Sequence, residues 1–150
     1  MPTSIRWPEV EVELSDEEVD ALRAELDALA STPKFAQFAP GLRNRFQPGV
    51  VVDREQLTNQ QLLTLIRALD HMRNAQQLGE GGHRVRDSIT AAGIRYKLEI
   101  HGAVQPADFI SYGGIYDEGD RLVAATGEVF RVAARRDESD ESLLVVVRSL

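Results

Sequence analysis

The chain has 150 residues, of which 43% are hydrophobic and 27% are charged, and it carries no cysteine and a net charge of −7. This length and composition are typical of a single globular domain with a sizeable core. The lack of cysteine excludes disulfides, thiolate metal sites and a cysteine nucleophile. No apolar run reaches the roughly 20 residues of a membrane span, and the N-terminal stretch is acidic rather than signal-like. These features predict a cytoplasmic protein without a membrane partner.

In the N-terminal half, Val10, Val12 and Leu14 alternate with glutamates, which predicts a strand or an extended arm. Ser15 and Glu18 fit a capping box that opens a helix running to about residue 31, and Thr32-Pro33 ends it. Residues 33–52 read as a broken helix or an ordered loop. A short turn at 53–57 precedes a main helix from about 59 to 78, ended by Gly79. The core face of this helix is expected to comprise Leu62, Leu65, Ile66, Leu69 and Met72.

In the C-terminal half, Gly79-Glu80-Gly81-Gly82 resembles a flexible linker, and a short helix is expected up to about residue 92. Strands are then predicted at about 94–101, 108–116, 121–126 and 128–134, followed by a polar loop over 135–142. Residues 143–147 are apolar on both faces, which indicates a central or doubly covered strand. The predicted class is α+β: one domain in which N-terminal helices (about 1–80) pack on a C-terminal antiparallel β-meander of four to five strands (about 83–150).

The charge is unevenly distributed along the chain. Residues 1–31 carry two arginines against nine acidic residues, whereas residues 32–52 carry Lys34, Arg43 and Arg45 and no acid. Phenylalanines interleave with these three cations, and such a segment could stack on a nucleic acid. We favour the other interpretation, in which the phenylalanines anchor the core and Arg43 and Arg45 face acids of the first helix or an acidic protein partner. The acidic total also disfavours nucleic acid, because phosphate binding needs a basic surface.

Motifs with chemical specificity are missing from the sequence. The three histidines, His71, His83 and His101, lack the spacing of a metal site. The glycine-rich stretch has neither the lysine nor the strand–helix context of a phosphate-binding loop, and no serine lies in a nucleophile elbow. We therefore expect no metal and no cofactor.

The acidic turn Asp117-Glu118-Gly119-Asp120 is the remaining candidate for acid–base chemistry, although such turns are usually solvated. It lies between the segment Phe109-Ile110-Ser111 and the segment Phe130-Arg131-Val132, an order that resembles the second half of an ADP-ribosyltransferase domain. In that family an E-x-E turn precedes an F-x-V strand, and here Glu118-Gly119-Asp120 stands in its place. The resemblance implies a small or degenerate enzyme domain with Glu118, Asp120 and His101 in its site.

A second resemblance covers the β-rich end of the chain. Gly119 to Leu122, Gly127 to Val132 and Leu143 to Val147 are similar to small β-modules of phage head–tail joining proteins. We therefore predict a non-catalytic protein–protein interaction or assembly module that self-associates, with Lys34, Arg43 and Arg45 toward the partner. The degenerate enzyme is the alternative. A deep pocket holding the acidic turn would favour the enzyme, and a flat apolar patch would favour assembly.

Overall fold

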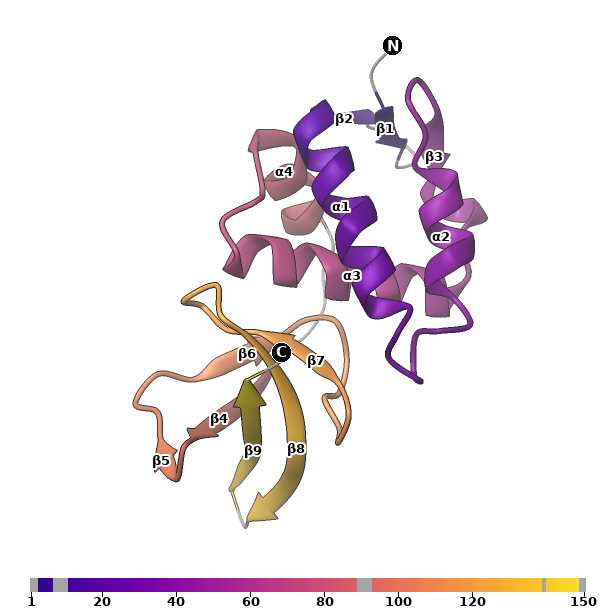
Figure 1. Cartoon of the computed structure of the whole chain (residues 1–150). Helices are drawn as coiled ribbons and strands as arrows, with labels where there is room; N and C mark the ends of the chain where they lie inside the picture. The colour runs from indigo at the N-terminus through magenta and orange to yellow at the C-terminus, as the bar shows by residue number, and fades with distance from the viewer. Residues whose placement is uncertain (1–2, 7–10, 89–92, 139, 149–150) are drawn as a thin grey trace.

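The computed structural model describes residues 3–6, 11–88, 93–138 and 140–148. Figure 1 shows a helical part with a small sheet above a strongly curved larger sheet, and together they form an α+β fold as predicted. Within the described residues, no helix is long and apolar enough to cross a bilayer. The sheets, however, are mixed rather than a clean antiparallel meander, and strands also occur before the first helix.

The small sheet has the order β2-β1-β3. It consists of β1 (Thr3–Arg6), β2 (Glu11–Leu14) and β3 (Val51–Asp53), and β1 pairs antiparallel with β2 and parallel with β3. Val12 and Leu14 of β2 point into the core, while the glutamates beside them are exposed, as the alternation predicts. The predicted extended segment is therefore one edge strand of a sheet that covers the helices.

Two helices begin at the predicted capping boxes. In α1 (Asp16–Leu29), the Ser15 hydroxyl accepts the Glu18 N–H and the Glu18 side chain accepts the Ser15 N–H. Thr58 and Gln61 make the same pair at the start of α3 (Asn59–Asn74). Between them lie the short helix α2 (Ala39–Arg45) and the turn η1 (Arg54–Gln56). The prediction that this helix runs to about residue 78 is wrong: α3 ends at Asn74, and Gln76 turns the chain away with a φ of 58°.

The predicted linker at 79–82 is instead the start of helix α4 (Glu80–Ser88). The Glu18 carboxylate accepts the N–H groups of Gly79 at 3.0 Å and Gly82 at 2.6 Å, so α1 caps the N-terminus of α4. Glycine is required for packing: a Cβ at Gly81 would lie 2.0 Å from the Glu13 carbonyl oxygen. The residues predicted to end this helix, 89–92, lie outside the described residues.

The larger sheet has the order β5-β4-β9-β8-β7, with β6 also paired to β4. Its strands are β4 (Ile94–Ile100), β5 (Ala103–Val104), β6 (Phe109–Ser111), β7 (Arg121–Val123), β8 (Val129–Glu138) and β9 (Glu141–Arg148). The meander prediction is wrong because β9 inserts between β4 and β8, parallel to the first and antiparallel to the second. The predicted polar loop at 135–142 is likewise wrong, since β8 and β9 continue as a hairpin and expose their charged residues on its surface.

Two apolar cores result. The first joins α1, α2 and α3 with the small sheet, and it includes Phe35, Phe46 and most of the predicted face of α3. The second lies inside the curved sheet, around Tyr96, Phe109, Tyr116 and Phe130. Strand β9 is central in the sheet, as its apolar sequence predicts, and its Leu144 and Val146 belong to this second core. Buried polar side chains lie between the two cores.

Candidate functional site

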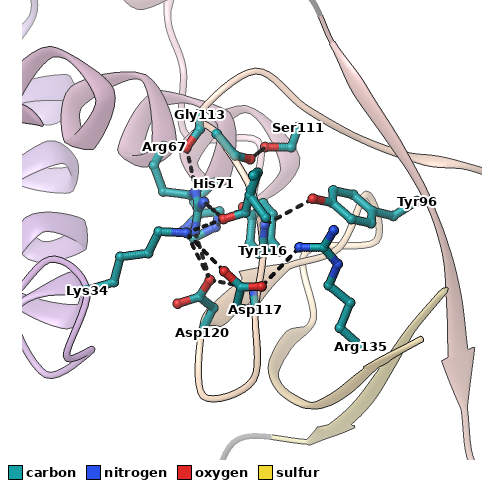
Figure 2. A network of polar contacts seen from close by, with 12 residues as sticks. Lys34, Arg67, His71, Tyr96, Ser111, Gly113, Tyr116, Asp117, Asp120 and Arg135 are labelled. Carbon is teal, nitrogen blue, oxygen red and sulfur yellow. Dashed lines mark hydrogen bonds and ion pairs between the residues drawn. The ribbon is translucent and has the colours of Figure 1, made fainter. Parts of the chain in front are cut away.

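A cluster of buried polar side chains joins the helical part to the curved sheet, and we call it the polar junction. Figure 2 shows Arg67 and His71 reaching from α3 toward the loop before β7. All its members are less than a tenth exposed except Arg121, and they come from α1, α3, the 112–120 loop and β7: Glu25, Arg67, His71, Tyr116, Asp120 and Arg121.

His71 lies at the centre of the polar junction and is fully buried. Its Nδ1 is 2.6 Å from Glu25 Oε1 and its Nε2 is 2.7 Å from the Tyr116 hydroxyl. Burial lowers the pKa of His71 below 6.5, although the Glu25 carboxylate partly opposes the shift. The ring is therefore neutral at pH 7, donating from Nδ1 to the carboxylate and accepting the Tyr116 proton at Nε2. Burial also raises the pKa of Tyr116, which keeps this donor protonated.

Glu25 carries the negative charge in the hydrogen-bonded series Glu25–His71–Tyr116. Burial alone would raise its pKa, but hydrogen bonds from His71 and Arg121 outweigh burial and hold the pKa of Glu25 below 4.5. Arg121 donates from Nε to Oε1 and from Nη2 to Oε2, both at 2.9 Å, in the two-bond geometry that guanidinium and carboxylate favour. This ion pair ties α1 to β7.

Arg67 is fully buried and its guanidinium lies between two rings, 4.9 Å from the Phe35 centroid and 3.7 Å from the Tyr116 centroid. Its Nε donates to the Gly113 carbonyl at 3.1 Å and its Nη2 to the Ile115 carbonyl at 2.8 Å. Its Nη1 is 3.7 Å from Asp120 Oδ2, which supplies the balancing charge. The loop can lie this close to α3 only because residue 113 is glycine: a Cβ at Gly113 would lie 2.6 Å from the Arg67 Cα.

The acidic turn is held by surrounding cations. Asp120 is buried, accepts the Asp117 N–H at 2.8 Å and lies 3.7 Å from Lys34. Arg135 donates to Asp117 at 3.0 Å, while Glu118 is exposed. His101 is exposed in the turn between β4 and β5, at the edge of the sheet opposite β7. The structure thus brings Asp120 into the polar junction and places Glu118 and His101 outside it.

The three basic residues of the 34–46 segment have different surroundings. Lys34 donates to the Ile115 carbonyl and pairs with the acidic turn (Figure 2). Arg43 pairs with Asp27 of α1 at 2.6 Å, so an acid of the first helix faces it. Arg45 is half-buried and has no ion pair with the described residues. Of the interleaved aromatics, Phe35 and Phe46 are buried core anchors, and Phe38 is half-buried.

Sequence reasoning missed Glu25, Arg67, Tyr116 and Arg121 as partners. One local signal pointed to this site: Arg67 and His71 are four residues apart and share a helix face, on a helix whose core residues are mostly apolar. Two polar residues on such a face indicate a polar contact in the core. Their partners could not be located, since they lie 45 to 48 residues away in the chain, and Arg121 lies 96 residues from Glu25.

The His71–Tyr116 pair at the centre of the polar junction can position a proton but offers no open position for a substrate, because both side chains are fully buried. No group of three or more possible metal ligands occurs among the described residues. Beside the junction, a groove of about 270 Å³ reaches Glu25 and Arg121 between α1 and the β7–β8 hairpin. Comparison with known protein families, with curated proteins and with solved structures finds no match to this chain.

Proposed function

We propose that the chain is a non-catalytic protein–protein interaction or assembly module that associates with a second copy through the outer face of its curved sheet. The observation that carries the proposal is an apolar stripe on the central strand β9. Leu144 and Val146 belong to the core, so the alternate residues Leu143, Val145 and Val147 share the opposite face. Val147 is 39% exposed and the other two are half-buried. We call these three residues the β9 stripe.

The register decides how a second copy could contact this strand. Both edges of β9 are already paired, to β4 on one side and to β8 on the other. Residues 143–147 therefore cannot pair edge to edge between copies, because no free backbone groups remain there. Association through the β9 stripe has to be face to face, by side-chain packing.

Charged residues flank the stripe in a way that suits a specific interface. Lys97 and Glu99 of β4 lie opposite Leu143 and Val145, and on the other side Arg131 and Arg136 of β8 lie opposite Val147 and Leu143. An apolar centre with charged residues around it is the usual anatomy of an interface.

The polar groups of the chain support the same proposal. The histidine, tyrosine and carboxylate that could act as acid and base are used internally in the polar junction, with each heteroatom of His71 already bonded. The acidic turn is neutralised by Lys34 and Arg135. The proposed contact with a partner is therefore the β9 stripe rather than a reactive side chain.

Sedimentation equilibrium across micromolar concentrations tests the proposal. The wild-type chain should form dimers, and Val147→Lys should weaken association by about tenfold or more, because a charge would enter the apolar centre. Val104→Lys is the matched control, since Val104 is 55% exposed on β5 at the sheet edge, outside the stripe. A wild-type chain that stays monomeric at high micromolar concentration would refute self-association, as would equal weakening by both variants.

A further inference from the structure

We propose that a hollow of about 190 Å³ between the end of α1 and the β7–β8 hairpin binds a single oxyanion group, a phosphate or a carboxylate. The residues that carry the argument are Thr32 on the α1 side and Arg121 and Arg131 on the sheet side, all of which line the hollow. This inference does not depend on the self-association proposed above.

The first observation is a pair of like charges. Arg121 of β7 and Arg131 of β8 are directly opposite in the antiparallel register, so their side chains leave the sheet on the same face. Like charges in directly opposite positions repel and destabilise a sheet. A counter-ion close to both guanidinium groups would remove that repulsion.

The chain itself supplies negative charge to only one of the two arginines. The Glu25 carboxylate takes Nε and Nη2 of Arg121, which leaves Nη1 without a hydrogen bond among the described residues. Arg131 is exposed and makes no ion pair with the residues that the structure describes. One positive charge is therefore uncompensated at the hollow, although the chain as a whole has a net charge of −7.

The walls of the hollow also favour an anion. None of its lining residues is acidic. Thr32 is only 4% exposed, lines the same hollow, and its hydroxyl makes no hydrogen bond with the described residues, so it is free to donate to an anion bound there. Two guanidinium groups and a hydroxyl are the donors that phosphate and carboxylate groups attract in proteins.

The size of the hollow limits what it can take. Pockets for drug-sized ligands span about 300–1,000 Å³, whereas this one has about 190 Å³. It therefore fits one oxyanion group and a few attached atoms rather than a whole nucleotide. A free anion and the charged end of a larger molecule would present the same group, so inorganic phosphate and acetate are the probes that separate the two chemistries.

The test is an NMR titration of the full chain with inorganic phosphate or acetate, at constant ionic strength. We expect saturable shifts of the Arg121 Nε–H and Thr32 amide signals with at least one of the two anions. Arg131→Gln should weaken that binding by about tenfold, the loss of one charge-assisted hydrogen bond. Arg136→Gln is the matched control, because Arg136 is exposed on the same strand but does not line the hollow.

A response to phosphate alone identifies a phosphate site, and a response to acetate alone identifies a carboxylate site. Thr32→Val removes the hydroxyl at nearly constant volume and should also weaken binding. Shifts that stay linear with both anions would overturn the proposal, as would equal weakening by Arg131→Gln and Arg136→Gln, because either result means unspecific attraction to a charged surface.

Discussion

Replacing Arg67 tests whether the polar junction holds the two cores together. Arg67→Met keeps a long flexible side chain but removes the buried donor of the Gly113 carbonyl and leaves the Ile115 carbonyl with Lys34 as its donor. Two such bonds contribute about 1 kcal/mol each, and the desolvated stacking between Phe35 and Tyr116 contributes about 2 kcal/mol. Asp120 also loses its buried counter-charge. We expect the free energy of unfolding to fall by about 3–5 kcal/mol, the usual range for breaking a buried ion pair.

Urea unfolding followed by circular dichroism measures this loss. Arg73→Met is the matched control, because Arg73 lies on the same helix, is half-buried and has no ion pair with the described residues. It should change stability by less than about 0.5 kcal/mol. Arg67→Lys should recover only part of the loss, since one ammonium cannot replace a planar group bonded to two carbonyls. A loss below about 1 kcal/mol for Arg67→Met would refute the assignment of Arg67 as the link between the cores.

Three further predictions concern stability. Burial lowers the pKa of His71 below 6.5, so acidification protonates this histidine in the unfolded chain first. The free energy of unfolding should therefore fall as pH drops below 6.5, by at most about 1.4 kcal/mol per pH unit. His71→Gln should flatten that slope in urea unfolding measured at several pH values. Leu69→Ala should cost about 2–5 kcal/mol in the same assay, since Leu69 is 1% exposed in the helical core, and a cost under half a kcal/mol would contradict the predicted helix face. Glu18→Gln should cost about 1–2 kcal/mol by weakening the charged cap on α4, whereas exposed Glu17→Gln should cost less than half as much.

Local features of the fold were predictable where neighbouring residues determine them. Ser15 with Glu18 and Thr58 with Gln61 fix two helix starts within four residues of sequence, and the structure has both boxes. The alternation over Ile94–Ile100 likewise predicts β4. Pairings between distant segments have no such signal. Nothing near β9 indicates that it lies parallel to β4, and nothing near β3 indicates that it pairs with β1.

The polar junction escaped prediction for the same reason. His71 alone on a helix looks like a solvated or capping residue, because its partners Glu25 and Tyr116 are 46 and 45 residues away. The pairing of Lys34 with the acidic turn spans more than eighty residues. Sequence charge clusters identified groups that need neutralising, but only the fold determines which acid neutralises which cation. Arg43 and Asp27 are the exception, since α1 and α2 are neighbours in the chain.

The account depends on the polar junction being closed, and the state of the His71 ring tests this most directly. Nitrogen-15 NMR of the histidine side chains distinguishes the two ring nitrogens, with exposed His83 and His101 as reference signals. The account predicts that His71 is neutral at pH 7, with its proton on Nδ1 beside Glu25, an unprotonated Nε2 bonded to Tyr116 and slow exchange with solvent. A His71 ring that titrates at or above about 6.5 and exchanges its proton rapidly would contradict it, because the junction would then be open to water and to substrates.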